Sequence, residues 1–185
     1  QEAYDLSTKH RFLKGESWAL NQIAGEFRKM GNNAQALEYY IRQLKIEEER
    51  NEPENMAVVN MNIALVYNSE KDTAKAISYI LKADSLIQAY HFADLQLYLL
   101  LNKGEIFEKA NRLKDALQIT RQCYDTAVLQ QNELIQGTAL NNLGNIYFKL
   151  GNYEEAINQY KSSYSLLSGQ NEYQIIAEGR VGLGK

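Results

Sequence analysis

The amino-acid sequence repeats itself every forty residues, and this period limits the possible folds more than composition does. Four repeats follow one another without insertion or deletion, at residues 17–56, 57–96, 97–136 and 137–176. The eighth position of each repeat holds a small residue, the eleventh an aromatic residue and the twentieth an alanine. A fixed period of this kind is typical of a solenoid, in which similar structural units stack on one another.

The recurring residues indicate a pair of antiparallel helices in each repeat. Positions 4, 7, 8 and 11 fall on one stripe of a helix, because successive residues are turned by about 100°. Small residues at positions 8 and 20 allow the two helices to approach closely, and the aromatic residue at position 11 fills the remaining volume. The chain has a single proline, which favours long helices. The three sets are Ala24, Ala64, Gly104 and Gly144; Phe27, Tyr67, Phe107 and Tyr147; and Ala36, Ala76, Ala116 and Ala156.

The pattern predicts ten helices, the last of them truncated, in a solenoid that continues in both directions. Residues 1–14 match the tail of the second helix of a preceding repeat. Residues 177–185 match the start of a fifth repeat, with Leu183 and Gly184 at positions 7 and 8.

The residues between the two helices of a repeat favour a tight turn. Gly31 and Gly151 suit the left-handed conformation that ends a helix, and Asn111 is a tolerated substitute. Lys71 occupies the same position in the second repeat, so we expect that turn to differ. Pro53 is well placed in the first turn of a new helix, where its missing N–H is not needed.

The fourth repeat carries a known motif. Leu143, Gly144 and Tyr147 match the L-G-x2-Y part of the pattern, and Ala156 and Tyr160 match its A-x3-F part. These residues resemble the tetratricopeptide repeat family, whose usual unit has 34 residues. The resemblance covers nearly the whole chain and implies an all-α, right-handed superhelical solenoid of stacked antiparallel helix pairs. The forty-residue period is similar to that of repeats in adaptor proteins and in sensor segments of bacterial regulators.

Two features depart from the family pattern. The usual proline at position 32 is missing, and with six extra residues per repeat we expect the second helix to run longer before it turns. The usual tryptophan at position 4 is replaced by Leu20, Asn60, Leu100 and Leu140.

The resemblance also implies that the first helices line a concave groove, through positions 2, 5, 6, 9, 12 and 13. Position 6 holds an amide in every repeat, as Gln22, Asn62, Asn102 and Asn142, although asparagine is only a middling helix former. Amides both donate and accept hydrogen bonds, so this ladder is suited to the backbone of an extended peptide. The alternative is that the amides cap neighbouring helices or face water. The candidate binding residues are Trp18, Asn21, Arg28, Asn62, Tyr98, Asn102, Glu105, Asn141, Asn142, Asn145 and Lys149.

Aromatic side chains and charges refine this expectation. Trp18, Tyr98 and Phe148 flank the amides and offer apolar anchors. The clamp for a terminal carboxylate that is known in the family needs lysines and arginines at defined groove positions. We do not expect that clamp, because Glu105 and Glu108 lie among the basic residues, which are Arg28, Lys29, Lys109 and Lys149.

Other classes of function lack support. A net charge of −3 and a pI near 5.5 argue against nucleic acid as a partner, and the longest apolar stretch, at 95–101, is too short for membrane insertion. Cys123 is expected to be a small, partly buried side chain. His10 and His91 lack metal-site spacing, so neither a metal nor a cofactor is expected. Gly179, Gly184 and Lys185 match the opening of a phosphate-binding loop, but the repeat itself accounts for Gly184.

We therefore predict a non-catalytic scaffold that recognises a protein or peptide on its concave face, as the sensing or docking segment of a larger regulator. The alternative is a structural role in which exposed repeat ends associate with a second copy. An enzymatic role would need activity from flanking sequence. Because the first residue is Gln1 and not methionine, we expect a processed extracytoplasmic (periplasmic) bacterial segment, with a cytoplasmic protein as the alternative.

Overall fold

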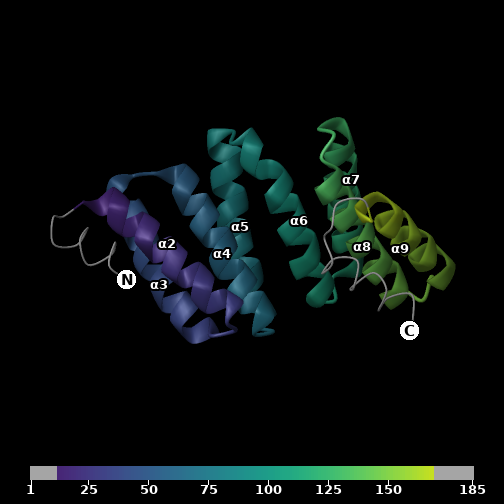
Figure 1. Ribbon diagram of the computed structural model, residues 1–185, viewed down its shortest axis with the longest axis horizontal. Helices are drawn as coiled ribbons and strands as arrows, with labels where there is room; N and C mark the ends of the chain where they lie inside the picture. Colours follow the sequence, from purple (N-terminus) through teal and green to yellow (C-terminus); the bar gives the residue numbers. More distant parts are fainter. Residues whose placement is uncertain (1–11, 169–185) are drawn as a thin grey trace. The chain divides into compact units, whose positions relative to one another are not determined.

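Eight helices make up residues 12–168, the part of the chain that the structure describes (Figure 1). In this computed structural model the described residues form no strand, which confirms the all-α fold class. The first helices of the four repeats are α2 (Leu13–Lys29), α4 (Pro53–Ser69), α6 (Ala93–Lys109) and α8 (Glu133–Lys149). The second helices are α3 (Asn33–Arg50), α5 (Thr73–Tyr90), α7 (Leu113–Leu129) and α9 (Tyr153–Leu167).

The helix boundaries follow the period of the sequence. Each first helix begins forty residues after the previous one and has 17 residues, and the second helices have 15 to 18. The second helices are thus about as long as the first. We had expected residues 13 and 14 to belong to a preceding repeat, but they belong to α2. The rest of that expected helix, the fifth repeat at 177–185 and the phosphate-loop motif lie outside the described residues.

All seven turns between the helices have the same geometry. A residue with a left-handed backbone recurs every twenty residues, and the next amide bonds to the carbonyl five residues earlier, at 2.8 to 3.1 Å. This is the Schellman arrangement. Lys71 has φ of 62°, like its counterparts, so the expectation of a different second turn is wrong. The left-handed residues are Gly31, Asn51, Lys71, His91, Asn111, Gln131 and Gly151.

The residue after the left-handed position begins the next helix. The side chains of Asn32, Asp72 and Asn132 accept a hydrogen bond from the backbone N–H three residues later, at 3.3, 3.1 and 3.1 Å. Such N-caps satisfy one of the free donors at a helix start. Pro53 stands at the start of α4, as predicted. Two residues therefore suffice to end one helix and start the next.

The helices gather into two compact units, an N-terminal unit up to Leu99 and a C-terminal unit from Leu100. In the N-terminal unit, α2 packs on α3, α3 on α4 and α4 on α5. Ala24 and Ala36 are fully buried at the first crossing, which confirms that small residues let the pair approach. The ring of Phe27 stacks on Tyr39 with centroids 5.5 Å apart.

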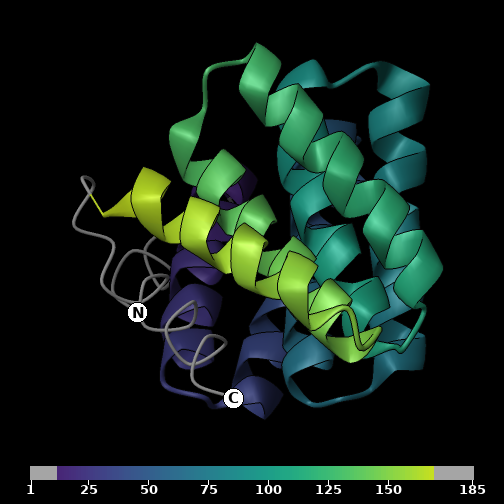
Figure 2. The same ribbon diagram turned by 90° about the vertical axis from the view of Figure 1, so that its right-hand side faces the viewer.

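In the C-terminal unit, α8 packs against both α7 and α9, and Figure 2 shows α9 lying along α8. Gly144 stands where a β-carbon would lie 2.5 Å from the ring of Tyr160, so only glycine admits that ring in its present position. Ile146 is fully buried because α8 is covered on two sides. Val66 is equally buried in α4. The stripe predicted at positions 4, 7, 8 and 11 omitted this second buried side.

Candidate functional site

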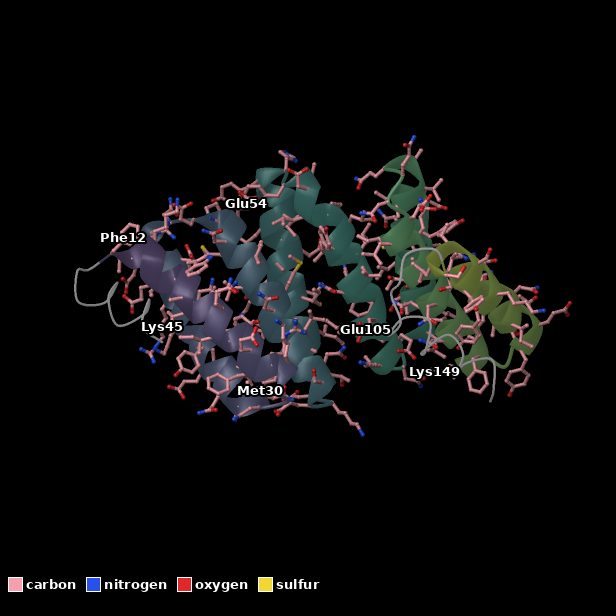
Figure 3. All side chains as sticks on the ribbon, viewed as in Figure 1. Phe12, Met30, Lys45, Glu54, Glu105 and Lys149 are labelled. Atoms are coloured by element: carbon pink, nitrogen blue, oxygen red, sulfur yellow. The ribbon has the colours of Figure 1, made fainter. Side chains whose placement is uncertain are left out.

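A groove with a volume of about 340 Å³ lies between α6 and α8, entirely within the C-terminal unit. Figure 3 marks its position by Glu105 on α6 and Lys149 at the end of α8. Each lining residue stands at a repeat position that the sequence assigns to the free face of a first helix. The lining residues are Leu101, Asn102, Glu105, Glu108, Lys109, Thr138, Asn142 and Asn145.

Three amides supply most of the hydrogen-bonding capacity of this groove. Asn102 and Asn142 are half-buried, and neither side chain has a hydrogen bond within residues 12–168. The Oδ1 atom of Asn145 accepts a hydrogen bond from the Tyr160 hydroxyl at 2.7 Å. That bond leaves the two N–H donors of Asn145 for other partners. Burial, together with the Glu108 carboxylate, raises the pKa of Tyr160, so its hydroxyl stays protonated and donates.

The charged side chains of the groove neutralise one another. Lys109 pairs with Glu105 at 2.7 Å, and Lys149 pairs with Glu108 at 2.6 Å. Lys149 also donates to the backbone carbonyl of Glu108 at 3.3 Å. Two lysines matched by two glutamates leave a polar groove without net charge. Such a groove is suited to an uncharged hydrogen-bonding partner, because a charged group would lose hydration without gaining a counter-charge.

A second hollow, of about 230 Å³, lies in the N-terminal unit between α2, α3 and the start of α4. Figure 3 locates this end of the unit by Phe12 and Glu54. Its floor contains a buried carboxylate, that of Glu47, which is 1% exposed. The hollow is lined by Lys14, Ser17, Trp18, Asn21, Gln43, Glu47, Arg50, Asn55 and Val58.

Family models of the tetratricopeptide repeat match residues 19–54, 57–90 and 138–166, which together make up more than half of the chain. The chain belongs to the tetratricopeptide repeat (TPR) family. No curated protein matches it. TPR repeat proteins are generally non-catalytic scaffolds, and the TPR fold supports a role in protein interaction. None of the helices within residues 12–168 has both the length and the apolar character needed to cross a membrane.

Solved structures with TPR-like folds resemble this TPR chain. A Rap protein complexed with Competence and Sporulation Factor is 18% identical with a TM-score of 0.80, covering 89% of this chain and 46% of that one. BtubC (BKLC) from P. vanneervenii is 18% identical with a TM-score of 0.71, covering 87% and 66%. A putative kinesin light chain from Podosopora anserina is 11% identical with a TM-score of 0.64, covering 85% and 78%. At these identities the likeness concerns the fold, and the TPR chain spans about half of the Rap protein.

The structure brings together some of the residues predicted to bind in the TPR groove and separates others. Asn102, Glu105, Asn142 and Asn145 line the groove between α6 and α8, and Lys149 pairs with its wall. Trp18 and Asn21 line the hollow in the N-terminal unit. Besides Lys149, the predicted residues that line neither are Arg28, Asn62, Tyr98 and Asn141.

The placement of Asn141 differs from the expectation. It is 2% exposed, whereas its neighbour Asn142 is half-buried and lines the groove. One step along a helix turns the side chain by about 100°, which moves Asn141 from the groove to the interior. In the present structure Asn141 therefore offers no surface to a partner.

Sequence reasoning missed the second-helix residues of the N-terminal hollow. Gln43, Glu47 and Arg50 belong to α3, whereas all the predicted binding positions lie on first helices. A signal was nevertheless present when the four repeats of this chain are aligned with one another. Position 31 holds Glu47 in the first repeat, whereas the others hold Ile87, Ala127 and Leu167.

Proposed function

We propose that this TPR protein is a non-catalytic scaffold that holds an extended peptide segment of a partner protein in the groove between α6 and α8. The observation that supports the proposal most is the pair of amides on facing helices, Asn102 and Asn142, which have no hydrogen bond within residues 12–168. Water hydrates such amides when no partner is present, and the N–H and C=O groups of a peptide backbone can replace that water.

The groove chemistry specifies what kind of segment would bind. A peptide backbone presents alternating N–H and C=O groups, and an amide can pair with either. Asn145, held through Tyr160, would donate to a backbone carbonyl. Because the groove has no net charge, a neutral stretch of the partner fits it better than a terminal carboxylate does. Binding would then depend little on the partner's side chains at this point.

The regulator role that we propose agrees with the bound state of a structural neighbour. The Rap protein structure holds Competence and Sporulation Factor, so a protein with a similar fold can carry a bound factor. We propose that the present chain likewise serves as the sensing or docking segment of a larger protein.

A display selection tests the proposal directly. Random twelve-residue peptides would be selected on the wild-type protein, and the dissociation constants of the winners measured by isothermal titration calorimetry. The variant Asn102→Ala with Asn142→Ala should weaken binding by about fivefold to a hundredfold, since the two lost hydrogen bonds contribute about 0.5–1.5 kcal/mol each. The control variant, Asn158→Ala with Gln118→Ala, removes exposed amides from second helices and should bind normally. Equal affinity for all three proteins would disprove the proposal.

One observation favours self-association as an alternative function. On α9, Tyr153, Ile157 and Tyr164 are 60%, 41% and 39% exposed, and they fall on one stripe of the helix. A second copy that stacked on this stripe would cover it. Sedimentation of the wild type and of Ile157→Glu over a range of concentrations tests this role: a dimer lost in the variant supports it, and a wild-type monomer at every concentration rules it out.

A further inference from the structure

The hollow in the N-terminal unit has a polar floor where the fold itself requires none. Ser17, Gln43 and Glu47 are 3%, 6% and 1% exposed. The second repeat carries apolar residues at the same three positions, and all of them are buried: Ala57, Ala83 and Ile87. Burying a carboxylate and an amide costs stability relative to apolar side chains of similar size. The first repeat therefore bears a polar cluster that its neighbour shows to be dispensable for folding.

The hydrogen bonds of this cluster determine which of its buried atoms lack a partner. The Ser17 hydroxyl donates to Oε1 of Glu47, and Nε2 of Gln43 lies 3.4 Å from the Ser17 oxygen. Since the only proton of the hydroxyl is committed to Glu47, Ser17 must accept from Gln43. The Oε1 atom of Gln43 consequently points away from Ser17, and it is buried without a hydrogen-bond partner. It is an acceptor that lacks a donor.

Glu47 also retains accepting capacity. Its Oε2 atom accepts from Arg50 at 2.7 Å and from Asn55 at 3.2 Å, whereas its Oε1 atom is paired only with Ser17. A carboxylate oxygen can accept two hydrogen bonds. Two oxygen acceptors, from Gln43 and Glu47, thus belong to the floor of the same hollow.

The rim and the surrounding charge favour a cation with a flat face. Trp18 lines the hollow and is 60% exposed, so its indole ring is available for stacking. Arg50 is balanced by Glu47 and by Glu52, at 2.7 and 3.0 Å. Residues 47–54 contain five glutamates and one arginine, which makes this segment acidic, whereas Lys14 on the rim of the hollow is basic. An acidic surface raises the local concentration of cations.

We propose that the hollow between α2, α3 and α4 binds a guanidinium group, supplied by an arginine side chain of the partner. The planar group stacks on the indole of Trp18 and donates N–H bonds to Oε1 of Gln43 and Oε1 of Glu47. A guanidinium fits better than an ammonium because its donors lie in one plane and point in several directions at once. The inference extends the proposed function by naming one residue of the partner, but the hollow can be tested without any peptide.

Trp18 makes the test specific, because it is the only tryptophan in the chain. Its fluorescence would be titrated with N-acetyl-arginine amide, with the neutral isostere N-acetyl-citrulline amide and with N-acetyl-lysine amide. We expect a saturable change with the arginine compound, at least tenfold weaker binding of the lysine compound and no saturation with citrulline. An identical response to arginine and citrulline would overturn the proposal, since the site would then not recognise the charge.

A matched variant separates the site from general folding. Ser17→Ala, Gln43→Ala and Glu47→Ile together install the residues of the second repeat, and arginine binding should fall at least tenfold while the circular dichroism spectrum stays helical. If that variant does not fold, Gln43→Leu alone removes the open acceptor and should also weaken binding. Unchanged arginine affinity in the folded variant would refute the inference.

Two further variants separate a failure of the guanidinium site from a failure of the peptide groove. Lys14 is exposed on the rim and repels a cation, so Lys14→Gln should strengthen arginine binding. Asn102→Ala with Asn142→Ala should leave the arginine titration unchanged, because both residues lie in the other unit. If the groove between α6 and α8 binds no peptide, the guanidinium site can still be tested. If the hollow binds no guanidinium, the groove can still be tested.

Discussion

The contact between Gly144 and Tyr160 gives a prediction that tests both the packing and the groove. A methyl group at Gly144 would lie 2.5 Å from ring carbon Cε1, which real side chains do not tolerate. The ring is 2% exposed, and its hydroxyl donates to Asn145 at 2.7 Å. We therefore predict that Gly144→Ala pushes the ring aside and breaks its hydrogen bond to Asn145.

The size of the effect follows from three contributions. Overpacking a close contact costs about 1–3 kcal/mol. Loss of the bond between Tyr160 and Asn145 costs a further 0.5–1.5 kcal/mol or so. Alanine is a better helix former than glycine by about 1 kcal/mol, which offsets part of the loss. The free energy of unfolding should fall by roughly 0.5–3.5 kcal/mol.

Urea unfolding followed by circular dichroism measures this change, and the second repeat supplies a rescue variant. There Ala64 and Ile80 occupy the corresponding positions, and both are fully buried. The double variant Gly144→Ala with Tyr160→Ile recreates that pair and should recover most of the lost stability. If Gly144→Ala instead raises stability by about 1 kcal/mol, as helix propensity alone predicts, the ring of Tyr160 does not depend on the glycine and the packing argument fails.

Two other predictions follow from the turns and the core. Lys71→Gly should stabilise the protein by about 0.5–1 kcal/mol, because glycine avoids the cost of about 1–2 kcal/mol that lysine bears in the left-handed conformation but loses more backbone freedom on folding. Gly31→Ala, where a β-carbon meets nothing within 4 Å, should destabilise the protein by about as much. Chemical denaturation measures both changes, and effects of the same sign would contradict the argument. Burial raises the pKa of the Cys123 thiol to about 12, so iodoacetamide at pH 8 should label it only after unfolding; rapid labelling of the native protein would show that the thiol is accessible.

The sequence alone predicts the helix pairs well because their packing depends on residues that recur. Ala24 and Ala36 meet at a buried crossing, as the period predicts. Lys71 shows where local preference misleads. A lysine on its own disfavours a positive φ by about 1–2 kcal/mol, but the turn's hydrogen bonds and the two packed helices outweigh that cost. Tertiary context decides such a turn, and a single-residue rule cannot include it.

The candidate site was predictable only in its register. Because every residue that lines the groove stands at a predicted position, the helical period suffices to select a face. It does not resolve the boundary of that face, where Asn141 is buried and Asn142 is half-buried. Nor does it indicate that α3 contributes Gln43 and Glu47 to a hollow, since that depends on how second helices pack against the first helices on either side.

The uniform turns have a consequence for how the protein transmits a binding event. With only two or three residues between successive helices, contacts join sequence neighbours, and the hydrogen bond from Lys149 to Glu108 spans only 41 residues. Cooperativity in such a chain passes from each helix to the next and weakens with distance, as in a one-dimensional lattice. A ligand that joins α6 to α8 should therefore slow amide hydrogen exchange most in α6 to α9 and least in α2 and α3. Ligand binding in the groove would therefore increase local stability by an amount that decreases with distance along the chain.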